Sequence, residues 1–186
     1  LATRTRSDIA YMVSILASAC SKQASWALEL SKKILRYLSG TRDQGLLISA
    51  KGDLTDLAVW TDAGFAGTDT HAQSGLVVSW GSSIITWRSC RQSVSTLNTA
   101  EAELNAASLG WQITEGLRGL LHDLGVRLGS IVVYVDNKAA LTILSCGGTW
   151  RTRYFTVRGH RLHEECARET AELRHCPTKG MIADAL

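Results

Sequence analysis

Two strand-like segments of the chain end in aspartate, a residue type that can bind a divalent metal ion. Asp62 closes "AVWTD" and Asp136 closes "VVYVD", each just before a change to loop or helix. If the two strands are parallel neighbours, their carboxylates lie ~5 Å apart, which is one strand spacing. Sites in open α/β sheets lie outside the carboxyl ends of the strands. Because like charges so close repel unless a cation neutralises them, and hard oxygen ligands select Mg²⁺ or Mn²⁺, we expect a metal site here.

A helix-forming stretch, "STLNTAEAELNAASLG" at residues 95–110, carries two further acids, Glu101 and Glu103. At about 100° per residue, Glu103 points with the core-facing residues, and Glu101 lies about 160° away on the polar side. Asn98 stands three residues before Glu101, a spacing that favours an N-cap. We therefore expect Glu101 to be a solvated first-turn acid and Glu103 to turn inward, where an ionised carboxylate needs a compensating cation. A fourth acid, Asp184 in "GMIADAL", is uninformative by itself.

The elements that must hold these acids can be predicted from the pattern of apolar residues, which indicates a mixed α/β chain with helices at its N-terminus. Residues 8–39 favour two helical pieces with a break near 21–25, and the main boundary is expected near 50–56. A β-rich block with a hairpin turn around Gly81 follows, and then a long helix over about 99–124. A buried strand, two helices, a final strand and the start of a last helix complete the order βββαβααβα.

The composition indicates a folded protein and excludes several classes. The chain has 186 residues, of which 45% are hydrophobic and 20% charged, and its net charge is +3; these values suit a globular domain. No apolar run approaches the ~20 residues of a membrane span. The cysteines form no CxxC pair, so we expect reduced thiols in a cytoplasmic or nuclear protein that is not secreted. Asp8 interrupts the basic and then apolar N-terminus, which we interpret as a fragment boundary followed by an amphipathic helix.

An ordered set of motifs resembles the RNase H domain of copia-type LTR retrotransposons. The set consists of "VWTDAGFAG", "ITWRSCRQ", "STLNTAEAELNAAS", "VVYVDNKAALTI" and "CPTKGMIADAL". The leading segments "TRSDIAYMVSILA" and "ILRYLSGTRDQGLLI" are similar to the tail of the reverse transcriptase that precedes RNase H in the same Pol polyprotein. The resemblance implies an RNase H-like fold at residues 53–186, with a five-stranded mixed sheet flanked by helices. Residues 1–52 are then expected to be the reverse-transcriptase tail.

The same resemblance implies an enzyme that hydrolyses the RNA strand of an RNA–DNA hybrid with two Mg²⁺ ions, for which Mn²⁺ can substitute. It places the family's acidic metal ligands on Asp62, Glu103, Asp136 and Asp184. Asp62 would bridge both ions, with Glu103 and Asp136 on one and Asp184 on the other. Reading ribose hydroxyls requires polar groups beside these acids, and the candidates are Thr61, Asn98, Thr99 and Asn137. Candidate phosphate contacts are Arg88, Arg91, Arg151, Arg153, Arg158 and Lys179.

Other interpretations remain open at this level. The chain could be a catalytically inactive RNase H-like module of a decayed or domesticated element, which binds nucleic acid or serves as structure. An integrase core on the same fold is less favoured, because the leading segment resembles reverse transcriptase. His160, His163 and Cys166 have a spacing that could hold zinc, although a polar stripe on an exposed helix is the preferred interpretation. The expected partners are the hybrid and the reverse transcriptase domain of the same polyprotein, and no association with a membrane is expected. The expected compartment is a cytoplasmic virus-like particle or the nucleus.

Overall fold

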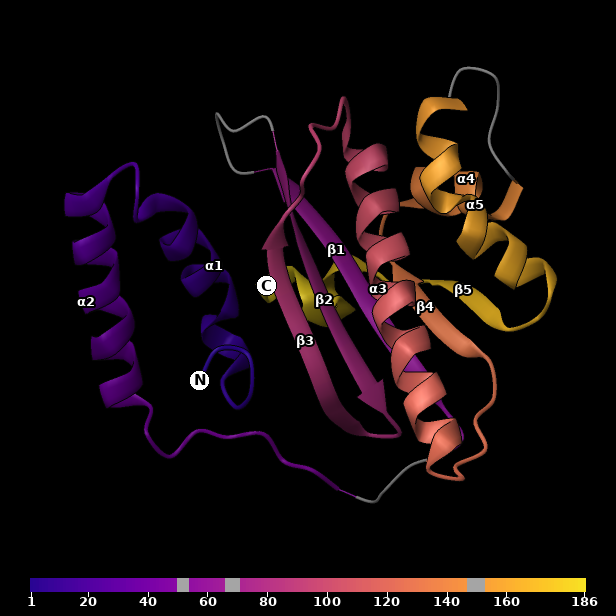
Figure 1. Ribbon diagram of the computed structural model, residues 1–186, viewed down its shortest axis with the longest axis horizontal. Helices are drawn as coiled ribbons and strands as arrows, with labels where there is room; N and C mark the ends of the chain where they lie inside the picture. The colour runs from indigo at the N-terminus through magenta and orange to yellow at the C-terminus, as the bar shows by residue number, and fades with distance from the viewer. Residues whose placement is uncertain (50–53, 66–70, 147–152) are drawn as a thin grey trace.

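The computed structural model describes residues 1–49, 54–65, 71–146 and 153–186, excluding the side chains of residues 65, 153–156 and 158 (Figure 1). The expected boundary between residues 52 and 53 therefore lies outside the described residues and stays a prediction. No helix in the described ranges is long and apolar enough to cross a membrane. All five cysteines fall within these ranges, and each is a free thiol.

A five-stranded mixed sheet forms the centre of the fold, as expected, in the order β3-β2-β1-β4-β5. Its strands are β1 (Leu57–Phe65), β2 (Ala72–Trp80), β3 (Ser83–Arg91), β4 (Ile131–Val135) and β5 (Ala171–His175). The first three strands are antiparallel neighbours, whereas β4 runs parallel to both β1 and β5. The β2–β3 connection is the predicted tight hairpin, in which Gly81 adopts a φ of 56°. The carboxyl ends of β1, β4 and β5 consequently meet at one edge of the sheet.

The long helix α3 (Thr99–Asp123) covers one face of this sheet, close to its expected bounds. Leu104 and Ala107 of α3 pack on Val59 of β1 and Val133 of β4 in the main apolar core. At Gly110 the helix approaches β1 so closely that a Cβ would lie 2.4 Å from Thr61 Cγ2. Helices α4 (Lys138–Cys146) and α5 (Arg153–Ala167) continue this layer beside β4 and β5 (Figure 1). The close approach at Gly110 thus fixes the distance between α3 and β1, the strand that carries Asp62.

The N-terminal segment comprises the 3-10 turn η1 (Ser7–Ile9) and the helices α1 (Ala10–Ala19) and α2 (Ala24–Gly40). One face of α2 is apolar and turns inward, with Ala27, Leu30 and Ile34 buried. Figure 1 shows α1 beside β3, at the opposite end of the sheet from α4 and α5. Ala10 joins an apolar cluster with Val77 and Trp87 on the sheet face away from α3.

The last part of the chain forms two short 3-10 turns, η3 (Thr178–Gly180) and η4 (Ile182–Ala185), where the start of a helix was expected. Between them Met181 has an extended backbone, with a φ of −78° and a ψ of 95°. This residue prevents the two turns from joining into one helix. The turn η4 packs on β1 and β2, on the face of the sheet opposite α3.

Candidate metal centre

Asp62 and Asp136 lie side by side at the edge where parallel strands end. Thr61 pairs with Val135 in the β1–β4 register, and each aspartate is the next residue in its strand direction. Because β1 and β4 are parallel, both carboxylates leave the same edge of the sheet. Both residues are half-buried. The expectation that the two acids are neighbours is therefore confirmed, but Asp62 does not end its strand: β1 continues to Phe65, paired with β2 alone.

Glu103 reaches the two aspartates from the second turn of α3. Its Oε1 accepts a hydrogen bond from the backbone N–H of Ala63, at 3.3 Å. One carboxylate oxygen from each of Glu103, Asp62 and Asp136 can be chosen so that all lie within 4.8 Å of one another. The second oxygen of Glu103, Oε2, is buried and makes no hydrogen bond to any described residue. The inward direction predicted for Glu103 is correct, and it leaves a buried oxygen that needs a partner.

The three carboxyl groups repel one another when all of them are ionised. Burial, followed by the charges of Asp62 and Asp136, raises the pKa of Glu103 to about 9. Burial, followed by the charges of Asp136 and Asp184, raises the pKa of Asp62. A bound divalent cation would remove both penalties, since it neutralises the repulsion and supplies the missing partner of Glu103 Oε2. An all-oxygen ligand set of this kind fits Mg²⁺ or Mn²⁺.

Asp184 lies beside this group on η4. It is exposed, and it is not among the three acids whose oxygens lie within 4.8 Å of one another. Its charge nevertheless acts on Asp62. The turn can come this close because Gly75, the β2 partner of Asp62, has no side chain: a Cβ there would lie 2.7 Å from the carbonyl oxygen of Ala183. The structure thus brings the fourth predicted acid close enough to Asp62 for their charges to interact.

Glu101 differs from its expected environment. It is buried, with an exposed fraction of 9%, whereas the helix geometry predicted a solvated acid. Its Oε2 accepts the N–H of Leu97 at 2.9 Å, and its own N–H donates to Asn98 Oδ1 at 2.8 Å. The predicted N-cap at Asn98 is confirmed. The expectation of solvation was wrong because the loop before the helix folds back over the first turn, which covers the carboxylate.

The residues expected to contact ribose hydroxyls differ in their exposure to solvent. Thr61 is fully buried and its hydroxyl donates to the carbonyl oxygen of Tyr134 at 3.2 Å, so this prediction was wrong. Neighbouring strand residues point to opposite faces, and Thr61 consequently faces α3 while Asp62 faces the other way. Asn98 and Thr99 are exposed at the start of α3. Asn137 is half-buried, and its Oδ1 accepts two backbone N–H groups at the start of α4.

The basic residues expected at phosphates lie at the surface where they can be described. Arg88 and Arg91 are exposed on β3, and Lys179 is exposed on η3. An Nη2 of Arg91 lies 3.1 Å from Nδ1 of His71. The remaining candidates fall outside the described residues or side chains: Arg151, Arg153 and Arg158.

Two residues hold Asp136 in place, His175 at the end of β5 and Thr178 in η3, and sequence reasoning missed both. The hydroxyl of Thr178 donates to Asp136 Oδ2 at 3.2 Å. Nε2 of His175 lies 3.1 Å from the backbone carbonyl oxygen of Asp136. The signal that could have revealed them is the strand "AELRH", since His175 pairs with Val135 once β5 is aligned parallel to β4.

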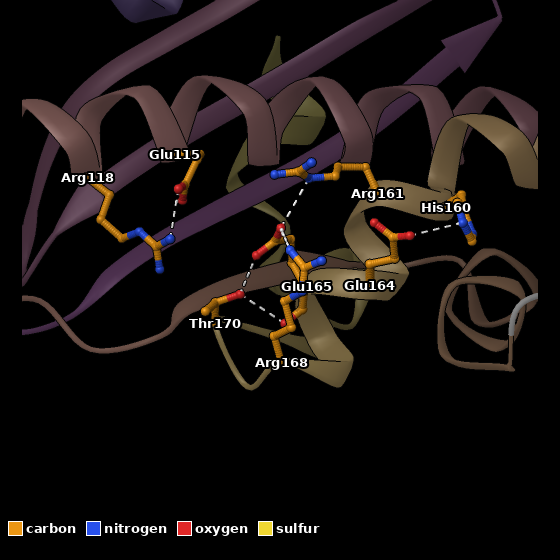
Figure 2. A network of polar contacts seen from close by, with 8 residues as sticks. All are labelled: Glu115, Arg118, His160, Arg161, Glu164, Glu165, Arg168 and Thr170. Atoms are coloured by element: carbon orange, nitrogen blue, oxygen red, sulfur yellow. Dashed lines mark hydrogen bonds and ion pairs between the residues drawn. The ribbon is translucent and has the colours of Figure 1, made fainter.

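The two histidines among the possible zinc ligands on α5 take part in other contacts. His160 pairs with Glu164 at 3.2 Å, and Nδ1 of His163 lies 2.7 Å from the carbonyl oxygen of Leu144. Figure 2 shows the neighbouring buried Glu165, contacted by Arg161 at 3.1 Å, by Arg168 at 3.2 Å and by Thr170 at 2.6 Å. In the described part of the chain, the acids at the sheet edge form the one group with metal-ligand geometry. The polar groups of α5 thus connect this helix to its surroundings.

Comparison with known proteins gives a consistent result. No protein-family model matches the chain. The chain is 29% identical over 187 residues to the retrovirus-related Pol polyprotein from transposon RE1 of Arabidopsis thaliana, an alignment that covers 98% of the chain and 13% of that protein. It is 31% identical over 186 residues to the corresponding polyprotein from transposon TNT 1-94 of Nicotiana tabacum, which covers 98% of the chain and 14% of that protein. The chain thus spans about one-seventh of the length of these relatives.

Solved structures show the same architecture. LC11-RNase H1, isolated from compost by a metagenomic approach and solved in complex with an RNA/DNA hybrid, superposes with a TM-score of 0.52 at 16% identity, covering 70% of this chain and 92% of that chain. Other solved RNase H domains give TM-scores of 0.51 to 0.53. The homologues of the chain are copia-type retrotransposon Pol polyproteins, and its fold is that of RNase H domains.

Proposed function

We propose that this chain is the RNase H domain of a retrotransposon reverse transcriptase and hydrolyses the RNA strand of an RNA–DNA hybrid. The observation that carries the proposal is the meeting of Asp62, Glu103 and Asp136 within 4.8 Å of one another, at the carboxyl edge of a sheet with the RNase H fold. A buried carboxylate cluster of this kind costs folding free energy, so its presence points to a role in function. The copia-type Pol relatives support the same assignment.

The proposed cofactor is a pair of Mg²⁺ ions, with Mn²⁺ as a substitute. Asp62, Glu103, Asp136 and Asp184 would hold them. When bound, such ions activate water as a nucleophile and stabilise the charge that develops on the scissile phosphate. The buried and unpartnered Oε2 of Glu103 supports this proposal, because it is an oxygen that a cation would satisfy.

The chain's own residues orient these acids before any ligand arrives. The N–H of Ala63 fixes one oxygen of Glu103, and the hydroxyl of Thr178 fixes one oxygen of Asp136. His175 contacts the backbone of Asp136 and so restrains the end of β4. The contacts of Ala63 and Thr178 each leave the other carboxylate oxygen of the acid for a ligand. Preorganisation of this kind reduces the cost of assembling the site when the substrate binds.

The proposed substrate contacts surround the acids. Asn98 and Thr99 are exposed at the start of α3, the helix that carries Glu103, and Asn137 follows Asp136 directly, so we propose that these side chains meet ribose hydroxyls. Although its oxygen caps α3, Asn98 retains an amide NH₂ group that can donate. Arg91 and Lys179 are proposed to contact backbone phosphates, which sets affinity without reading sequence. The hybrid bound to LC11-RNase H1 supports this class of substrate.

The relatives also support the context of the proposed domain. Because they are Pol polyproteins, we assign the reverse transcriptase domain of the same polyprotein as a partner, with residues 1–52 as its tail. The compartment follows from this assignment: a cytoplasmic virus-like particle, or the nucleus.

Cleavage of a hybrid with labelled RNA tests the proposed function. Wild-type protein should cut the RNA strand with Mg²⁺ or Mn²⁺, and Asp136→Asn should reduce the rate at least ~10³-fold, because it removes one charged ligand of the site. If the wild-type protein binds the hybrid but does not cleave it with either metal, the chain is an inactive RNase H-like module. Thermal unfolding of both proteins controls for misfolding.

A further inference from the structure

The N-terminal segment makes a continuous set of contacts with the turn that carries Asp184. We propose that α1 is a positioning element for Asp184, acting through Gln73 and the turn η4, and that it thereby controls the affinity of the carboxylate cluster for divalent metal. This inference rests on the proposed function in assigning Asp184 to the metal site. It adds to that function a link between the site and a segment far from it in sequence.

A chain of hydrogen bonds forms the first part of the link. The side-chain amide of Gln73, on β2, donates to Ser14 Oγ of α1 at 2.9 Å and to Ser89 Oγ of β3 at 2.8 Å. Ser89 in turn donates from its hydroxyl to the carbonyl oxygen of Leu186, immediately after η4. Gln73 has an exposed fraction of only 6%. A buried amide with both hydrogens engaged favours one arrangement of its partners, since a lost bond would leave a buried donor unsatisfied.

A shared apolar cluster forms the second part of the link. Ala10 of α1 packs with Trp87 of β3 and with Met181, Ala183 and Leu186 around η4. These residues share one sheet face, so α1 and η4 bury apolar surface in the same place. Burial of this kind depends on close packing, and displacing one member changes the contacts of the others. The indole N–H of Trp87 also donates to the carbonyl oxygen of Ala2 at 2.6 Å, which ties the start of the segment to the same cluster.

The turn η4 needs such support because it has little structure of its own. It is a four-residue 3-10 turn without a side-chain cap. Isolated turns of this length are unstable in water, so tertiary contacts must determine where η4 lies. Gly75 leaves room for the turn above the sheet, but absence of a side chain supplies no attraction. The attraction therefore comes from the apolar cluster and from the hydrogen bond to Ser89.

The position of η4 decides how Asp184 acts on Asp62. Asp184 is exposed on this turn, and the residue before it, Ala183, has its carbonyl oxygen 2.7 Å from where a Cβ of Gly75, the β2 partner of Asp62, would lie. Asp184 is nevertheless outside the three-acid group that lies within 4.8 Å. A modest displacement of η4 would therefore strengthen or weaken its contribution to a shared metal site. A change in the contact between α1 and Gln73 would therefore change the affinity of the site for metal.

Mn²⁺ binding to the metal-free full chain, measured by titration calorimetry without nucleic acid, tests this inference. Gln73→Met keeps the length of the side chain and removes both hydrogen bonds, and should weaken Mn²⁺ binding about fivefold, the factor expected for a net hydrogen bond. Ser14→Ala removes only the contact with α1 and should weaken binding roughly two- to threefold. Ser18→Ala is the matched control, one turn along the same helix with its hydroxyl on the helix backbone. Ser18→Ala and the hydroxyl-retaining Ser14→Thr should both bind as wild type.

A double-mutant cycle shows whether the effect passes through Asp184. In the Asp184→Asn background, Gln73→Met should change Mn²⁺ affinity by less than about twofold, because the group that it positions is gone. Equal losses in both backgrounds, or equal affinities for Ser14→Ala and Ser18→Ala, would overturn the inference. If the wild-type protein binds Mn²⁺ but does not cleave the hybrid, the proposed function fails while the cycle still decides this inference. Absence of Mn²⁺ binding by the wild-type protein contradicts both.

Discussion

Glu103→Gln tests whether the acids at the sheet edge form one electrostatic unit. Burial and the charges of Asp62 and Asp136 raise the pKa of Glu103 from 4.5 to about 9 in the folded, metal-free protein. Because the folded state then holds a proton that the unfolded state has lost, the contribution of Glu103 to stability is most favourable below pH 4.5 and falls as the pH rises toward 9. At ~1.4 kcal/mol per pH unit, wild-type folding is weakened by up to ~4 kcal/mol at about pH 7.5.

The glutamine side chain has nearly the same shape and carries no charge, so Glu103→Gln removes this cost. In EDTA, the variant should melt at about the same temperature as wild type at pH 5 and at a higher temperature at pH 8. A difference of ~4 kcal/mol corresponds to roughly 8–16 °C for a chain of this size. The same variant should lose nearly all hybrid cleavage.

Glu101→Gln is the matched control for this experiment. It changes a buried glutamate two residues away and retains an acceptor for the N–H of Leu97. Its melting temperature should follow that of wild type at both pH values, and its cleavage rate should be close to that of wild type. Equal shifts for the two variants would refute the assignment of Glu103 to the cluster. So would a difference between wild type and Glu103→Gln that does not change with pH.

Three further predictions concern packing, metal binding and substrate. Gly110→Ala should destabilise the fold by about 1–3 kcal/mol in urea unfolding, because its Cβ would meet Thr61 Cγ2 at 2.4 Å. Gly116→Ala, where the space is open, should stabilise α3 by ~0.5–1 kcal/mol. A Gly110→Ala variant more stable than Gly116→Ala would contradict the packing described. Thr178→Val should weaken Mn²⁺ binding about fivefold by releasing Asp136, and Thr178→Ser should restore it; a wild-type affinity for the valine variant would exclude this role. Hybrid affinity should fall linearly with salt concentration on a log–log scale, as phosphate contacts require, and an affinity independent of salt would argue against them.

The main elements of the site were predictable because they follow from short-range periodicity. The strand that carries Asp62 and the strand that Asp136 follows can be recognised from their apolar runs, and α/β connectivity makes such strands parallel. The helical period is enough to choose Glu103 over Glu101 as the inward-facing acid. The same alternation of faces could also have excluded Thr61 as a surface contact, since it neighbours Asp62 in one strand.

Other features depend on the conformation of a loop or on contacts between distant segments, which the periodicity of the sequence does not encode. Glu101 is buried because the loop that contains Leu97 folds over the first turn of α3. Thr178 reaches Asp136 only after β5 has been placed beside β4. The contact between Ser14 and Gln73 joins residues 59 positions apart, through a side chain that looks unremarkable in the sequence. Such contacts are set by the tertiary fold.

We propose that Asp62, Glu103, Asp136 and Asp184 together support cleavage of the RNA strand of a hybrid, and strand-resolved cleavage tests this proposal. Matched 20-mer hybrid, duplex DNA and single-stranded RNA, each labelled on both strands where two are present, would be incubated with the wild-type protein and Mg²⁺. We predict fragments from the RNA strand of the hybrid alone, and none from any substrate with Asp136→Asn. Cleavage of duplex DNA at a similar rate, or RNA fragments that persist with Asp136→Asn, would contradict the account.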